Sequence, residues 1–267
     1  MKNNITSQTE RVFNQTKSLW NSIVNNSEEA DNFNENFISQ FPLLDIVDAV
    51  NSVVAIFNYT KFHPEFITKN VREIVGLNQE DLLIQGSPLL YNSLHPTHNQ
   101  IFLILAKQLQ LIFINKDYNE NSNLLATTCG VKFVHPEKGV IRILMQMYYI
   151  DNDAQNLPIR SIVTMRDVTH LMKSDAYFIR NIYGDKHQYV QVFHSDPSIS
   201  TAQNDILSLR EKEVLHLISK DKDNDEIAET LGISRNTVRN HRQNMLDRLG
   251  ARDTTALLEL ARICHII

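Results

Sequence analysis

The side chains with the clearest chemical pattern lie between Ser234 and Gly250. On a helix with about 100° per residue, this segment has an apolar side and a polar side. The apolar side carries Val238, His241, Met245 and Leu249, whereas the polar side carries Asn236, Arg239, Asn240 and Gln243. Arginine can bind phosphate or guanine, and asparagine and glutamine amides can pair with adenine edges in the major groove. The segment therefore predicts a helix that packs with one side and contacts double-stranded DNA with the other.

The same segment is basic, although the whole chain is not. Between Ser234 and Gly250, four arginines stand against one aspartate, which gives a local charge of +3. These arginines are Arg235, Arg239, Arg242 and Arg248. The chain as a whole has a net charge of −5, which excludes a generally basic protein that binds polyanions everywhere on its surface. A nucleic-acid partner would therefore have to be bound by this local patch.

Three local signals predict where the helices around this segment begin. Ser208 with Glu211 and Asp223 with Glu226 have the spacing of a capping box, in which two side chains satisfy free N–H groups at a helix start. Ser234 can cap a third helix that starts at the next residue. The expected apolar sides of the first two helices are formed by Val214, Leu217 and Ile218, and by Ile227, Ala228 and Leu231.

The connection between the second and third helices has the length of a helix-turn-helix motif. Gly232 stands where a helix end favours a residue that tolerates positive φ, and Leu-Gly-Ile-Ser then joins two short helices. We predict this motif at residues 223–242. A fourth helix is expected from Asp253, with Ala256, Leu257 and Leu260 on its apolar side.

From Leu207 onward the sequence resembles the LuxR/GerE family of bacterial helix-turn-helix domains. The resemblance is carried by LSLREKEVLHLI, EIAETLGIS and NTVRNHRQNMLDRLGA, without an insertion. It implies a four-helix domain whose third helix enters the major groove and whose fourth helix can form a dimer contact, so that a homodimer reads a two-fold site. The family's contacts fall on Arg239, Asn240 and Gln243, with Thr237 near phosphate. The complete set of expected DNA-contacting residues is Arg235, Asn236, Thr237, Arg239, Asn240, Arg242, Gln243 and Arg248.

Some residues depart from the usual pattern of that family. Asp221 stands where the family often has a turn glycine, and Asp225 stands where it often has lysine or arginine. The second departure predicts a weaker phosphate-binding surface. The acidic run also has the spacing of an EF-hand start, but Glu226 replaces the glycine that its tight turn needs, so no calcium site is expected. Asn240 and Gln243 are polar where many members differ, which leaves the preferred DNA sequence open.

The preceding part of the chain has the pattern of an α+β domain. Strands are predicted at residues 53–59, 65–70, 124–135, 140–150, 159–168 and 188–194, and helices at 71–76, 78–83 and 97–112. From about Asp45 to Met172 the sequence resembles a PAS domain through GLNQEDLL, SLHPTHNQIF and IRSIVTMRDVTHL. The resemblance implies an antiparallel sheet with helices on one side. We expect a filled core, built by residues such as Ile101, Leu105, Ile143, Met145 and Met147, rather than a ligand pocket.

These patterns divide the chain into four segments. We predict a helical lead-in at residues 1–40, the PAS-like domain at 41–195, a linker at 196–205 and the helix-turn-helix domain at 206–267. The longest apolar stretch, residues 101–114, is interrupted by polar residues, and the N-terminus lacks the apolar region of a signal peptide. We therefore expect a cytoplasmic protein without a membrane segment.

No catalytic, cofactor or metal site is predicted, and an enzyme is the least supported class. The seven glycines are too dispersed for a phosphate-binding loop. The histidines His63, His95, His98 and His135 lack the spacing that places two metal ligands on one helix face. Cys129 and Cys264 are expected to be buried free thiols, and Cys129 falls in a predicted strand rather than on the helical side that a flavin adduct would need.

Two hypotheses about function remain from the sequence. The first is a transcription regulator in which the PAS-like domain, responding to an unknown small molecule or protein signal, controls DNA binding by the C-terminal domain. The alternative keeps DNA binding but makes the N-terminal domain only a dimerisation or protein-interaction module without a small ligand.

Overall fold

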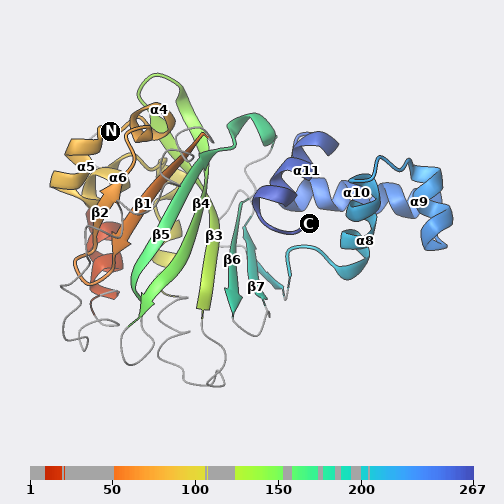
Figure 1. Ribbon diagram of the computed structural model, residues 1–267, viewed down its shortest axis with the longest axis horizontal. Coiled ribbons are helices and arrows are strands. Elements are labelled where there is room, and N and C mark those ends of the chain that lie inside the picture. Colours follow the sequence, from red (N-terminus) through yellow and green to blue (C-terminus); the bar gives the residue numbers. More distant parts are fainter. Residues whose placement is uncertain are drawn as a thin grey trace. The chain divides into compact units, whose positions relative to one another are not determined.

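In the computed structural model, the described residues are 10–19, 21, 51–105, 107, 124–152, 158–173, 177–183, 188–193, 200–203 and 205–267. The chain forms two units. The first contains Met1–Asp167 and Asn181–His187, and the second contains Val168–Arg180 and Gln188–Ile267. Figure 1 shows long strands in the first unit and helices near the C-terminus in the second.

The first unit is built on an antiparallel sheet. Its strands are β1 (Ser52–Asn58), β2 (His63–Ile67), β3 (Leu124–His135), β4 (Gly139–Asn152) and β5 (Pro158–Asp167). Neighbours in the order β2-β1-β5-β4-β3 all pair antiparallel. Met145 lies opposite Met165, and Met147 lies opposite Val163, so these four buried side chains share one face of the sheet.

Short helices accompany this sheet. They are α4 (Val71–Val75), α5 (Gln79–Gln85), α6 (Ser87–Asn92) and the 3-10 helix η1 (Pro96–His98). The sequence predicts α4 and α5 but not α6. Residues 101–105 and 107 of the predicted helix 97–112 are helical, and so are residues 10–19 and 21 of the predicted lead-in. The other positions of those two predictions lie outside the described residues. The arrangement is the predicted α+β, PAS-like fold.

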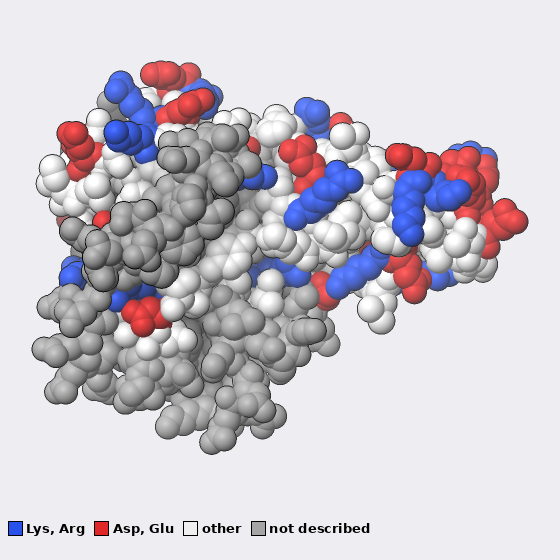
Figure 2. Space-filling view, in the orientation of Figure 1, with Lys and Arg blue, Asp and Glu red and all other residues white. Residues whose placement is uncertain are grey.

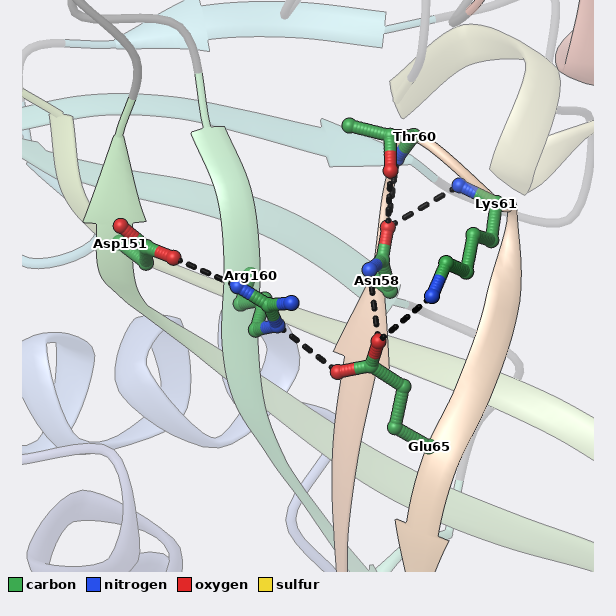
Figure 3. Close-up of polar contacts among 6 residues, drawn as sticks. All are labelled: Asn58, Thr60, Lys61, Glu65, Asp151 and Arg160. Carbon is green, nitrogen blue, oxygen red and sulfur yellow. Dashed lines mark hydrogen bonds and ion pairs between the residues drawn. The ribbon is translucent and has the colours of Figure 1, made fainter. Parts of the chain in front are cut away.

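A buried polar network ties together one end of the sheet (Figure 3). Asn58, the last residue of β1, accepts backbone N–H groups of the following turn and donates to Glu65 of β2 at 2.7 Å. Arg160 of β5 donates to Glu65 and to Asp151 of β4, each at 2.8 Å. The Arg160 side chain is only 3% exposed, so both carboxylates are needed to compensate its buried charge. The network joins the hairpin of β1 and β2 to β4 and β5, which are distant from it in sequence.

The second unit contains the predicted helical domain. Its helices are α8 (Leu209–Ile218), α9 (Asn224–Leu231), α10 (Arg235–Leu249) and α11 (Thr254–Ile263), and a 3-10 helix, η2 (Thr169–Leu171), lies against α11. The core of the helical domain is formed by Val214, Leu215, Ile227, Val238, Met245, Leu257 and Leu260. No helix in the described part of the chain is long and apolar enough to cross a membrane.

The boundary between the units differs from the predicted linker at 196–205. Residues Ser200–Gln203 of that linker form β8, which pairs antiparallel with β7 (Gln188–Phe193), and β6 (Tyr177–Tyr183) is divided between the two units. The second unit also includes Val168–Arg180, because backbone hydrogen bonds join Leu171 and Lys173 to the segment between α10 and α11. Sequence patterns do not reveal such pairing between distant segments.

Candidate functional site

The three predicted caps are all present. In the first capping box, Ser208 accepts the backbone N–H of Glu211, and the Glu211 carboxylate accepts the backbone N–H of Ser208 at 2.8 Å. Asp223 and Glu226 form the second box in the same way. Ser234 accepts the backbone N–H of Thr237 at 3.0 Å. These local bonds fix the starts of α8, α9 and α10.

Helix α10 has the two sides that the sequence predicts. Val238, Met245 and Leu249 are buried against the other helices, and His241 is half-buried. The exposed side carries Arg235, Asn236, Arg239, Asn240 and Gln243, with half-buried Thr237 in the first turn. Two arginines and three amides therefore project from the exposed side of the helix, where they can reach phosphates and base edges.

Two of the expected DNA-contacting residues, Arg242 and Arg248, also have hydrogen-bond partners within the protein. Arg242 donates to the Asn224 side chain at 2.8 Å and to the Thr254 hydroxyl at 3.0 Å, which connects α10 to the first residues of α9 and α11. Arg248 donates at 2.7 Å to Glu211, which is 2% exposed. A helical wheel misses this use of the two guanidinium groups because their partners lie on other helices.

The charges near the N-terminus of α10 are partly compensated. Arg235 lies 3.3 Å from Asp225, the residue that stands where the family often has a cation. In the view of Figure 2, acidic side chains gather over α9 with basic ones beside them. Asp221 has a φ of +59°, the left-handed conformation that explains why related sequences often place glycine there. Gln243 donates at 2.8 Å to Asp247, one helical turn further on.

The caps of these helices are titratable. Backbone N–H groups, that of Glu226 above all, lower the pKa of Asp223, and the backbone N–H of Ala256 lowers the pKa of Asp253, the N-cap of α11. The hydrogen bond from Lys222 is the main cause that lowers the pKa of Glu226. A carboxylate whose pKa is lower in the folded state stabilises the fold above its ordinary pKa, and this contribution is lost as the pH falls.

The helical domain should therefore lose helix content as the pH falls below about 4. Asp223→Asn keeps a capping side chain but removes one titrating group. As the pH falls, this variant should therefore lose less of its circular dichroism signal at 222 nm than the natural protein does. The measurement is a titration of both proteins from about pH 6 to about pH 2. Identical acid profiles would show that the Asp223 carboxylate contributes nothing to this transition.

The first unit contains a cavity of about 90 Å³ where the sequence predicts a filled core. Its walls are largely apolar and include Ala55, Phe57, Phe62, Leu82, Tyr91, Phe102, Leu105, Met145, Met147, Val163 and Met165. The prediction of a filled core is wrong here. Leu105, Met145 and Met147, which are predicted to fill that core, line the cavity. The same apolar residue types build a filled core and a cavity wall, so composition cannot distinguish them.

The tyrosine hydroxyl groups near the cavity are neutral. The hydroxyl of Tyr59 lies 3.0 Å from the Ser161 hydroxyl, and burial raises the pKa of both Tyr59 and Tyr91 above the ordinary value for tyrosine. Residues 10–19 contribute Thr16 to the wall, and the ring of Phe13 meets that of Tyr91 edge-on at 5.3 Å. Such a cavity favours a small uncharged molecule.

The two cysteines are buried and unpaired, as the sequence predicts. Cys129 and Cys264 are buried free thiols, and burial raises the pKa of each to about 12. Thiols with this pKa are poor nucleophiles near neutral pH. Among the described residues, no group of three or more His, Cys, Asp or Glu side chains is placed to hold a metal ion.

Four capped helices with an exposed arginine and amide face define the second unit as a helix-turn-helix domain. A family profile described as "Bacterial regulatory proteins, luxR family" matches residues 205–261. The spore germination protein GerE of Bacillus subtilis is 44% identical over 59 residues, which are 22% of this chain and 80% of GerE. The chain belongs to the LuxR/GerE family of bacterial regulatory proteins.

Other relatives match the same region but are longer than the match. The transcriptional regulatory protein MctR of Rhizobium johnstonii is 43% identical over 58 residues, which are 22% of this chain and 27% of MctR. The oxygen regulatory protein NreC of Staphylococcus aureus is 37% identical over 75 residues, 28% of this chain and 35% of NreC. The chain thus spans about a third or less of these two relatives.

Solved structures of VqmA from Vibrio cholerae match more of the chain at lower similarity. One, of a VqmA dimer without target DNA, covers 82% of this chain and 86% of VqmA, with 17% identity and a TM-score of 0.29. Another, of a VqmA–ligand–DNA complex, covers 82% and 85%, with 15% identity and a TM-score of 0.31.

Proposed function

We propose that this protein is a transcription regulator that acts as a homodimer in the cytoplasm and binds DNA through α10. The observation that carries the proposal is the exposed face of α10, where Arg239, Asn240 and Gln243 project from a helix-turn-helix domain of the LuxR/GerE family. Its relatives GerE, MctR and NreC are named as regulatory or germination proteins, and no enzymatic activity is expected of this chain.

The exposed residues take different roles in the proposed complex. Arg239 binds phosphate or guanine, and Asn240 and Gln243 read base edges, with Asn236 beside them. Arg235 and Thr237, in the first turn of α10, approach the DNA backbone, where helix N-termini favour phosphate. For Arg242 and Arg248 we propose mainly a supporting role, because each donates hydrogen bonds that hold α10 against neighbouring helices. A dimer would present two such helices to a site with two half-sites.

The cavity of the first unit supports a signal-responsive regulator over a purely structural N-terminal domain. About 90 Å³ of space holds several water-sized volumes, which corresponds to a small ligand. Its apolar and aromatic walls, together with neutral tyrosine hydroxyls, favour an uncharged molecule. Such a ligand could change DNA affinity by at most the factor by which its own affinity differs between the DNA-binding and the non-binding state of the protein.

We expect small neutral metabolites to distinguish this proposal from the alternative. At a concentration about a hundredfold above its Kd, a ligand should raise the Tm of the first unit by about 5 °C, and the same ligand should change affinity for DNA. Ala55→Leu fills part of the cavity from β1 and should abolish both responses while leaving DNA binding intact. The measurements are melting curves and binding isotherms of the full-length protein.

The matched control is Arg239→Ala, which should lose DNA affinity but keep the ligand-induced rise in Tm. If no compound in a broad metabolite panel changes the melting of the natural protein, the N-terminal domain is better described as a dimerisation module. If the natural protein shows no DNA binding that salt can weaken, the proposed function itself fails.

A further inference from the structure

The six residues that follow β5, Val168–Lys173, form part of the helical unit and are called the strap below. Val168 and Leu171 are 1% and 2% exposed, so the strap is anchored by buried side chains and is not a free tether. It starts three residues after Met165, which lines the cavity on β5. The strap is therefore the first segment that a change in the end of β5 would move.

The strap pairs with the short connection between the recognition helix α10 and α11. The backbone N–H of Lys173 donates to the carbonyl of Gly250, and the backbone N–H of Arg252 donates to the carbonyl of Leu171, each at 2.8 Å. Between these bonds, Met172 forms an antiparallel bridge with Ala251, which is fully buried. Two bonds around one bridge fix the strap at the C-terminal end of α10.

The strap pairs with the short connection between α10 and α11. Gly250 ends α10 in the left-handed conformation, with a φ of +66°, and Asp253 caps the start of α11. The three residues Gly250–Arg252 therefore set the position of α10 relative to α11. Because the strap is bonded to the first and last of them, its attachment selects one geometry of the two helices.

The strap also reaches a residue that is expected to read DNA. The Lys173 ammonium lies 3.5 Å from the Asp247 carboxylate, whose same oxygen accepts the Gln243 amide at 2.8 Å. An amide group has two N–H donors, so the bond to Asp247 orients Gln243 and leaves the second donor and the carbonyl oxygen for an adenine edge. Lys173 offsets the charge of Asp247, which would otherwise repel nearby phosphates.

A second connection is made at the other end of α11. The Arg180 guanidinium donates to the carbonyl of Cys264, which follows the last turn of α11, and Arg180 is 3% exposed. The next residue, Asn181, belongs to the first unit and accepts the Thr127 hydroxyl at 2.8 Å. Both ends of α11 are thus held by segments whose chain neighbours belong to the PAS-like unit.

We propose that the strap couples the PAS-like domain to DNA reading, with Lys173 as a positioning residue for Gln243 through Asp247. While the strap is paired with Gly250–Arg252, α10 and Gln243 are held in the geometry that reads DNA. A change at the cavity end of β5 that pulls on Val168 would release them. The coupling to a signal rests on the proposed function, whereas the positioning of Gln243 does not.

The test compares Lys173→Ala with Lys173→Pro in the full-length protein. Alanine removes only the ion pair, whereas proline also removes the N–H that donates to Gly250. Met172 already has an extended backbone, with φ −106° and ψ 137°, which is the conformation that precedes proline. Lys138→Ala, an exposed lysine on the turn before β4, is the control for the lost charge.

Binding to a randomised duplex of about 20 bp, followed by sequencing of the bound fraction, gives affinity and base preference. Lys173→Ala should weaken binding about two- to fivefold and relax preference at the one position that Gln243→Ala also relaxes, with an unchanged Tm. Lys173→Pro should weaken binding about tenfold, and the Arg252 amide should exchange faster with solvent in this variant. Lys138→Ala should change neither property.

Two results would overturn the inference. Unchanged base preference in Lys173→Ala would show that Lys173 does not position Gln243. Unchanged exchange at Arg252 and unchanged affinity in Lys173→Pro would show that the strap does not hold α10. If the natural protein fails to bind any duplex, the proposed function fails, and hydrogen exchange alone then decides whether the strap is attached.

Discussion

Replacing Arg239 with alanine should lower affinity for duplex DNA about tenfold and should reduce the slope of log affinity against log salt by about one. Arg239 is exposed in the middle of α10. Among the described residues, no ion pair or hydrogen bond engages its guanidinium, so the charge is available to DNA. The loss should be similar for all sequences if Arg239 contacts phosphate, and concentrated at one base pair if it contacts guanine.

Binding isotherms at several salt concentrations would measure this effect, with Arg72→Ala as the control. Arg72 is an exposed arginine on α4 of the first unit, so this variant makes the same change in net charge away from α10. The companion variant Asn240→Ala should cost about 1–3 kcal/mol of discrimination at one base pair and leave the salt slope unchanged. If Asn240→Ala altered neither affinity nor preference, the assumed docking of α10 in the major groove would be wrong.

The helical domain could be predicted because its determinants are local in sequence. Each capping box involves residues three positions apart, and the buried and exposed sides of α10 follow from helical periodicity alone. Ser208, Asp223 and Ser234 were therefore assigned to the correct helix starts. Residues on the exposed side of α10, such as Asn240, could be named for the same reason.

What sequence reasoning missed depends on distant partners. Arg242 and Arg248 count as part of the basic segment in the sequence, and their hydrogen bonds within the domain cannot be foreseen because the partners lie on other helices. The pairing of Met172 with Ala251 joins segments separated by most of the helical domain, and neither segment carries a strand-like pattern. Residue type and helical periodicity alone do not show which arginines of α10 also have hydrogen-bond partners within the domain.

In the PAS-like domain, too, local features could be predicted from the sequence and features that depend on distant residues could not. Alternating apolar residues predicted β3, β4 and β5 within a few residues, because period-two patterns mark strands that are half-buried. The cavity between the sheet and the helices could not be predicted. It depends on how Ala55, Val163 and Met147 fill the space together, and each of them would suit a closed core equally well.

Replacing Glu211 with alanine should destabilise the C-terminal helical domain by about 3 kcal/mol. This carboxylate is 2% exposed and accepts three hydrogen bonds, two from Ser208 at 2.8 Å and one from Arg248 at 2.7 Å. Its removal abolishes a capping box and leaves Arg248, whose side chain is 32% exposed, without its counter-charge. Denaturant unfolding followed by helix content, with a probe in this domain, would measure the loss.

Glu226→Ala is the matched control, since Glu226 closes the equivalent capping box of α9 but faces solvent and pairs with exposed Lys222. It should destabilise the domain far less than Glu211→Ala, because the Glu226 carboxylate and its partner Lys222 are both solvent-exposed, whereas Glu211 is buried and accepts three hydrogen bonds. The double variant Glu211→Ala with Arg248→Ala should lose less stability than the two single variants added together. If Arg248 acted only as a DNA contact, Arg248→Ala would reduce DNA affinity and its salt slope at unchanged stability. The effects of Arg248→Ala and Glu211→Ala would then be independent of each other.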